Sequence, residues 1–314
     1  LKIGIAKDEI AQAELEFKNI WLNITRQIKE QYAGTWLEQK SIELAKENLN
    51  IANRLLDQVQ VRFDEGKARQ HELARAKLET ANARNSLLKT ENNFRIALGK
   101  LNIYMGRNMD ELVKLQDVLT VSEMKNALEN YLQSALTHRP DVLIQEREVK
   151  KKEKELSLFK RKKLPDVTVG LFANREEDMY NAGAGLAFEL PIWTQFQGEV
   201  EEAKLQKETA DIHFDALKRS IELEVYEAFQ NVSLTFQTVH HLEDAIKEAN
   251  ELLRIITIEY EEGEAPFLTY LEGIAAYQKT KQEYLEALTD YSHKLADLEQ
   301  SIGQIQEFTE EKTK

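Results

Sequence analysis

The sequence predicts a mainly α-helical protein, built from two tandem repeats that each form a long helical hairpin of the coiled-coil type, with one β-hairpin. Only 12 of the 314 residues are glycine and 4 are proline, whereas 31% are charged. So few helix breakers favour long helices. Residues 198–262 contain no proline, and their apolar residues recur about every 3.5 positions, the period of a left-handed coiled coil. The same pattern occurs 197 residues earlier, which indicates a duplicated helical unit.

The first repeat is expected to occupy residues 1–106. Its long helix carries an apolar seam of Phe17, Ile20, Ile24, Ile28, Ile42, Ala45, Leu49, Ala52, Leu56, Val59 and Phe63. The helix should end at Gly66, and a second helix should return to Gly106. Gly66 and Gly106 recur 197 residues later as Gly263 and Gly303. Glycine at these points predicts left-handed helix caps.

A linker and a short helix are expected between the repeats, over residues 107–137, with the helix at about 123–137. The second repeat then covers residues 138–314. It should begin with a helix over 140–163, because Pro140 is tolerated at the first helical position. A β-hairpin over 164–193, a helical hairpin over 198–303 and a C-terminal tail complete the predicted order.

The β-hairpin is predicted from strict alternation of residue types. Its apolar positions are Val167, Val169 and Leu171 in the first strand, and Leu186, Phe188 and Leu190 in the second. Small or polar residues lie between them, so each strand has one apolar face. The polar stretch 174–181 should connect the strands. Two strands alone are marginal in water and leave open edges in a membrane. The hairpin is therefore expected to pair with other copies or, alternatively, to pack on a helix of a soluble protein.

Composition excludes several function classes. The net charge of −13 disfavours binding to nucleic acid. The chain has no cysteine. His240 and His241 are adjacent, which is not the i, i+3 or i, i+4 spacing that places two metal ligands on one helix face. No catalytic set of residues stands out. We therefore expect no enzyme activity, no cofactor and no metal site.

Several short motifs follow one another in a characteristic order. Arg139-Pro140-Asp141 precedes Leu164-Pro165-Asp166, which is followed by Leu190-Pro191-Ile192 and Gly198-Glu199-Val200. An aromatic residue three positions before a glycine occurs in both repeats, as Phe63-Asp64-Glu65-Gly66 and Tyr260-Glu261-Glu262-Gly263. The order, spacing and duplication of these motifs extend over the whole chain, which resembles the TolC-like family of outer-membrane efflux proteins. The stretch from Ile192-Trp193 to Gln197-Gly198-Glu199 is similar to the heavy-metal branch of CusC and CzcC.

The resemblance implies a homotrimer in the outer membrane, whose protomers share a transmembrane β-barrel and extend helices into the periplasm. It implies passive export of substrates delivered by an inner-membrane transporter and a periplasmic adaptor, in a tripartite efflux or type I secretion system. The alternatives are a coiled-coil scaffold or tether without a pore, and the adaptor itself. The spacing of 197 residues maps Leu1 onto Gly198, so we expect an N-terminally truncated chain that lacks the first hairpin.

The resemblance also implies functional positions. Glu72 and Tyr260 correspond to residues of the periplasmic aperture. The adaptor is expected to dock at the two helical turns, on Gly66, Lys67, Ala68, Gly263, Glu264 and Ala265. The six apolar strand residues named above should face outer-membrane lipid. The basic run from Lys150 to Lys163 has two interpretations, a membrane-interface contact or a solvated helix face.

Overall fold

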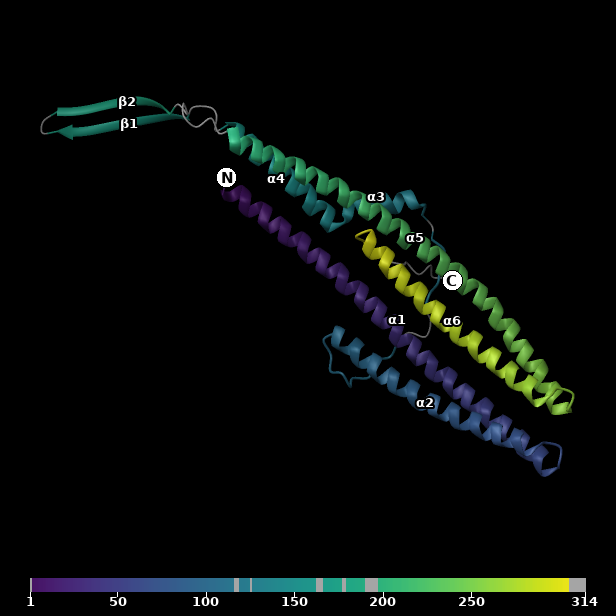
Figure 1. Cartoon of the computed structure of the whole chain (residues 1–314). Helices are drawn as coiled ribbons and strands as arrows, with labels where there is room; N and C mark the ends of the chain where they lie inside the picture. Colours follow the sequence, from purple (N-terminus) through teal and green to yellow (C-terminus); the bar gives the residue numbers. More distant parts are fainter. Residues whose placement is uncertain are drawn as a thin grey trace, which may run out of the picture. The chain divides into compact units, whose positions relative to one another are not determined.

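A computed structural model describes residues 2–115, 119–124, 126–161, 166–176, 179–189 and 197–304 (Figure 1). The elements in chain order are α1 (Lys2–Asp64), α2 (Gln70–Tyr104), α3 (Leu128–His138), α4 (Pro140–Arg161), β1 (Asp166–Glu176), β2 (Met179–Glu189), α5 (Gln197–Glu262) and α6 (Phe267–Ser301). The predicted mainly α-helical architecture with a single described β-hairpin is confirmed.

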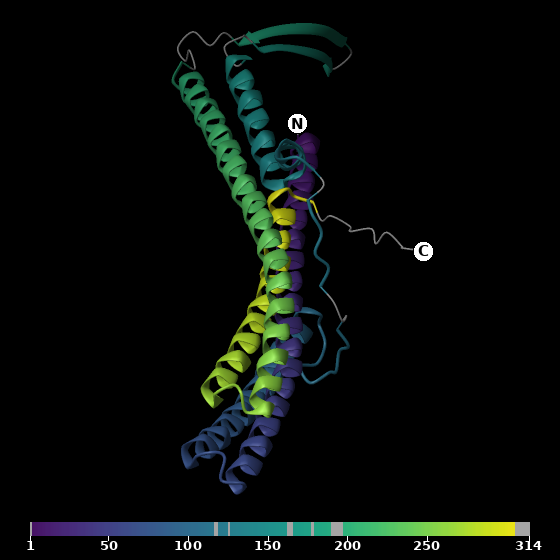
Figure 2. The ribbon, with the colours of Figure 1, turned by 90° about the vertical axis from the view of Figure 1, so that its right-hand side faces the viewer.

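The two helical hairpins have matching dimensions. The long helices α1 and α5 contain 63 and 66 residues, and the return helices α2 and α6 contain 35 residues each. Both hairpins turn at the same end, as Figures 1 and 2 show. Among the described residues, no helix combines the length with the apolar character that crossing a membrane would require.

Each helix of the duplicated pairs ends at a left-handed glycine. Gly66, Gly106, Gly263 and Gly303 have φ values of 72°, 69°, 83° and 69°. In the two hairpin turns, Lys67 N–H donates to the Arg62 carbonyl and Glu264 N–H to the Glu259 carbonyl, both at 2.8 Å. These bonds span six residues and satisfy carbonyls that the helix end would leave unpaired. The predicted glycine caps are confirmed.

The chain divides into two compact units. One contains Leu1–Asn19 and Ala135–Leu223, and the other contains Ile20–Ser134 and Glu224–Lys314. Each unit has buried apolar residues of its own. They include Val142, Ala203 and Ile221 in the first unit, and Leu55, Val59, Val225 and Tyr291 in the second. The helical turns and their core lie entirely in the second unit.

The predicted short helix is wrong at its start. Residues 123, 124, 126 and 127 are not helical, and α3 begins only at Leu128. A tertiary contact explains the difference, because the Tyr291 hydroxyl on α6 donates to the Ser122 carbonyl at 2.6 Å. This bond holds the preceding segment against α6, and local helix propensity does not register such contacts.

The β-strands extend further into the polar stretch 174–181 than the sequence predicted. β1 and β2 pair antiparallel from Asp166↔Glu189 to Glu176↔Met179, so most of the predicted connector over 174–181 belongs to the strands. A β-ladder is made by backbone groups, and polar side chains do not prevent it. Leu190 and the two residues between the strands lie outside the described residues, as do Pro165 and Pro191.

Candidate functional site

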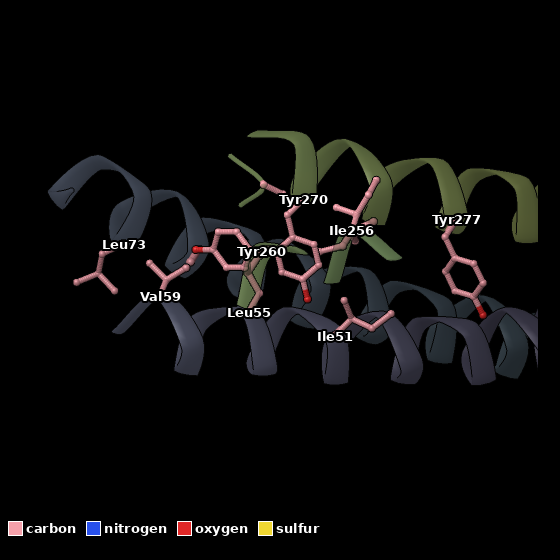
Figure 3. Packing of buried hydrophobic residues seen from close by; sticks show 11 residues of the cluster. Ile51, Leu55, Val59, Leu73, Ile256, Tyr260, Tyr270 and Tyr277 are labelled. Atoms are coloured by element: carbon pink, nitrogen blue, oxygen red, sulfur yellow. The ribbon is translucent and has the colours of Figure 1, made fainter. Parts of the chain in front are cut away.

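A shared hydrophobic core joins the two helical turns. It contains Ile51, Leu55, Val59, Leu73, Ala76, Ile256, Tyr260, Ala265, Tyr270, Ile274 and Tyr277. These residues come from α1, α2, α5 and α6, and Figure 3 shows them interleaved between the helices. We call this part of the molecule the tip. Because both repeats contribute, the two turns are held together as one surface.

Tyr260 is at the centre of the tip core. Its side chain is 2% exposed, and its ring stacks on Tyr270 with centroids 4.8 Å apart. The ring centroid of Phe267 lies 6.2 Å from that of Tyr260. Burial raises the pKa of Tyr260 above its ordinary value. The positive charge of nearby Arg62 opposes this increase only in part. The hydroxyl is buried and has no hydrogen-bond partner among the described residues.

Arg62 of α1 links the first repeat to the second. Its Nη1 donates to the Tyr260 carbonyl at 2.6 Å, and its guanidinium carbon lies 4.8 Å from the Tyr260 ring centroid. A cation over an aromatic face is attracted by the negative charge of the ring face. One side chain therefore holds both the backbone and the ring that end α5.

A groove runs across the tip beside this link. It encloses about 590 Å³ and is lined by residues of both turns, among them Arg62, Lys67, Tyr260 and Gly263. Its remaining walls are formed by Asp57, Gln58, Val61, Glu65, Glu261 and Glu262. Gln58 Nε2 also donates to Glu261 Oε1 at 2.6 Å, which is a second bond between the repeats.

The predicted docking residues divide by exposure. Gly66, Lys67, Gly263 and Glu264 are exposed at the turns, whereas Ala68 is partly buried and Ala265 belongs to the core. The predicted aperture residues also differ. Glu72 is half-buried in the first turn of α2, while Tyr260 faces inward. The side chains of Tyr260 and Ala265 therefore support the tip surface from beneath.

A polar cluster joins the repeats further along the helices. The Tyr277 hydroxyl donates to Glu47 Oε1 at 2.7 Å, Lys281 Nζ donates to the other carboxylate oxygen, and Lys281 Nζ lies 2.9 Å from the Tyr277 hydroxyl. Burial alone would raise the pKa of Glu47, but the hydrogen bonds from Lys281 and Tyr277 lower it overall. The charged form of Glu47 is therefore favoured by folding.

This cluster predicts a pH dependence of stability. A carboxyl group whose pKa is lowered by folding stabilises the folded state at any pH above 4.5, its pKa in the unfolded chain. This stabilisation is lost as the pH falls through the lower pKa of the folded state. Thermal unfolding should therefore be measured at neutral and at strongly acid pH. Between these two conditions, Glu47→Gln should lose less stability than the unaltered chain.

Glu38 provides a control of opposite sign. Burial raises the pKa of Glu38, and a hydrogen bond with Asn93 lowers it by a smaller amount. Ionised Glu38 therefore disfavours folding at neutral pH. Glu38→Gln should therefore enlarge the acid-induced loss of stability. If both variants changed the loss in the same direction, the assigned role of Glu47 would be wrong.

The β-hairpin separates two kinds of surface. Directly opposed residues in an antiparallel ladder share a face, and the ladder pairs Val167 with Phe188, Val169 with Leu186 and Leu171 with Ala184. The other face pairs Thr168 with Ala187 and Gly170 with Gly185. Val169 and Leu171 are 68% and 85% exposed. Five of the six predicted lipid-facing residues thus share one face, and the sixth, Leu190, lies outside the described residues.

Sequence reasoning missed Arg62, Glu47 and Lys281. One signal could have indicated Arg62, because the repeats differ there: Arg62 corresponds to Glu259 at the constant spacing of 197 residues. Opposite charges at equivalent positions can mark a contact between repeats. Within the described part of the chain, no three histidine or carboxylate side chains are grouped as a metal site requires.

A family model described as "Outer membrane efflux protein" matches residues 1–107 and 131–304. The cobalt-zinc-cadmium resistance protein CzcC of Cupriavidus metallidurans is 24% identical over 298 residues, which cover 94% of this chain and 71% of CzcC.

Solved structures share the fold at low sequence identity, VceC and MtrE among them. The outer membrane protein VceC of Vibrio cholerae has a TM-score of 0.77 at 18% identity, over 95% of this chain and 74% of VceC. The MtrE outer membrane channel of Neisseria gonorrhoeae, in its open state, has a TM-score of 0.73 at 15% identity, over 93% of this chain and 68% of MtrE.

Proposed function

The chain belongs to the outer membrane efflux protein family, and we propose that three copies of it assemble into one export duct. Its function as an outer-membrane efflux channel, with the helical part in the periplasm, follows from that membership and from its relatives. Assembly into a trimer and the choice of partners are the proposed part.

The hairpin carries the proposal of self-assembly. β1 and β2 form a sheet of two strands, and the other edge of each strand is unpaired among the described residues. Each unpaired backbone group costs roughly several kcal/mol in a bilayer. Membrane-spanning strands therefore occur in closed barrels. Strands from further copies would complete the ladder.

An exposed apolar stripe on α1 supports the same conclusion. Ile20, Trp21 and Ile24 lie within four residues of one another in the second unit, and all three are exposed. Ile24 is 45% exposed, whereas its counterpart in the second repeat, Ile221, is 1% exposed. A contiguous apolar stripe of this kind is typical of a protein–protein contact. A neighbouring copy would cover it.

The assembly test uses the mass of the purified chain in detergent. We expect a particle with about three times the chain mass of 36.3 kDa. Trp21→Glu with Ile24→Glu should lower this mass, because it places charges in the apolar contact. Leu112→Glu is the control, since Leu112 is 89% exposed in the linker and lies outside the stripe. A monomeric unaltered chain would contradict the proposal.

At the tip, the proposal assigns docking of a periplasmic adaptor that connects to an inner-membrane transporter. The exposed turn residues and the groove beside them form a surface shared by both repeats. Glu72 would contribute charge near the aperture, with Tyr260 holding the turn in place. CzcC is a cobalt-zinc-cadmium resistance protein, which suggests divalent metal ions as the exported substrates.

Docking can be tested by crosslinking, because the chain contains no natural cysteine. Single cysteines at Lys67 and Glu264 should crosslink to a co-expressed adaptor in the periplasm. A cysteine at Glu243, which is also exposed but lies within α5 away from the turn, is the control and should not. Crosslinks at Glu243 without crosslinks at the turns would place docking on the side of the helices.

A further inference from the structure

Helix α4 carries an exposed basic stripe along one face. The stripe consists of Arg147, Lys150, Lys151, Lys154, Leu158 and Arg161, all of them exposed. All but one of the steps between these residues are three or four positions, which keep side chains on the same side of a helix. The opposite side contacts α5, where Lys152 Nζ donates to Gln206 Oε1 at 3.2 Å. The stripe therefore points away from α5.

The two ends of the stripe differ in how their charges are balanced. Lys150 pairs with Glu146 and Lys151 with Glu148 on the same helix. Such exposed pairs are typical of a solvated helix face and contribute little. Lys154 and Arg161 of the stripe, and Lys160 beside it, are exposed and form no ion pair with any described residue. We call these three residues the terminal cations of α4.

The dipole of α4 balances only part of this charge. A helix C-terminus carries roughly half a negative charge, whereas the terminal cations carry three positive ones. Leu158, which is exposed, lies between Lys154 and the last two cations. The end of α4 thus combines uncompensated positive charge with an apolar side chain, as membrane-interface segments do.

The covalent chain keeps this end of α4 near the hairpin. β1 begins at Asp166, five residues after Arg161. Five residues span at most about 17 Å even when fully extended. In an outer-membrane protein whose helices lie in the periplasm, the terminal cations are therefore tethered beside the periplasmic headgroup layer.

We propose that the terminal cations of α4 bind anionic phospholipid headgroups of the periplasmic leaflet, with Leu158 inserted between them. The whole chain carries a net charge of −13 and would be repelled by an anionic surface. Attraction to such a surface must therefore come from a local basic patch. The inference assumes that the hairpin enters the membrane, as proposed above.

The test compares binding of the full chain to two kinds of vesicle. One is pure phosphatidylcholine, and the other has a third of it replaced by phosphatidylglycerol. Each cation near an anionic surface adds about a fivefold gain in binding. The triple variant Lys154→Gln, Lys160→Gln, Arg161→Gln should therefore lower the preference for anionic vesicles roughly 100-fold. Binding to pure phosphatidylcholine should stay unchanged.

A matched variant controls for total charge. Lys77→Gln, Arg84→Gln, Lys89→Gln removes two lysines and one arginine that are exposed on α2. It should leave the lipid preference unchanged. Equal losses in both triple variants, or an unchanged preference in the α4 variant, would overturn the proposal. So would a loss of subunit association in the α4 variant with lipid binding intact, because the stripe would then contact a second copy. Failure to bind neutral vesicles would count against hairpin insertion alone.

Discussion

Replacing Val169 with arginine is expected to cost about 2–4 kcal/mol of the free energy of membrane assembly. Val169 is 68% exposed near the middle of β1 and shares its face with Leu186. If that face meets lipid, the guanidinium has no water or partner at the bilayer midplane. Urea titration of the full chain refolded into lipid vesicles measures the loss.

The neighbouring position supplies the control. Thr168 is paired with Ala187 on the opposite face of the same strand, which would line the water-filled interior of a closed barrel. Thr168→Arg introduces the same side chain one residue away and should cost much less. Equal costs at the two positions would mean that neither face is selectively exposed to lipid.

Much of the fold follows from local patterns. The seam that repeats about every 3.5 residues predicts long helices because that period keeps apolar residues on one side. The glycine positions predict the ends of the hairpins because the left-handed cap excludes most other residues. Both signals lie within a few residues of the feature that they determine, and the structure has α5 ending at Glu262, just before Gly263.

The parts that sequence reasoning missed depend on contacts between distant segments. The segment before α3 is bonded to Tyr291, which is 169 residues away from Ser122 in the chain. The link from Arg62 to Tyr260 spans 198 residues. A periodic pattern identifies an apolar seam, but it does not say which partner covers it or whether any does.

The duplicated aromatic residue at the turns illustrates this limit. Phe63 and Tyr260 occupy equivalent positions, each three residues before a capping glycine. Phe63 is 36% exposed, whereas Tyr260 is 2% exposed. The sequence motif is the same in both repeats, and only the packing of one hairpin on the other distinguishes them. The two positions should therefore respond differently to the same substitution.

Tyr260→Ala is expected to destabilise the tip by about 3–5 kcal/mol, the usual cost of removing a buried aromatic side chain. It removes the ring that stacks on Tyr270 and underlies Arg62. Because the helices beyond the tip have cores of their own, the loss should be local. Hydrogen exchange of the backbone amides around Ile256 and Tyr270 measures it directly.

Two matched variants separate the ring from the hydroxyl and from the motif. Tyr260→Phe should be neutral or slightly stabilising, because the buried hydroxyl has no partner among the described residues and its burial is uncompensated. Phe63→Ala removes the equivalent aromatic from a half-exposed site and should cost distinctly less than Tyr260→Ala. If Phe63→Ala and Tyr260→Ala accelerated exchange equally, the tip would not be organised around Tyr260. If only Tyr260→Ala also abolished crosslinking from Lys67 to the adaptor, the buried ring would be what holds the docking surface in shape.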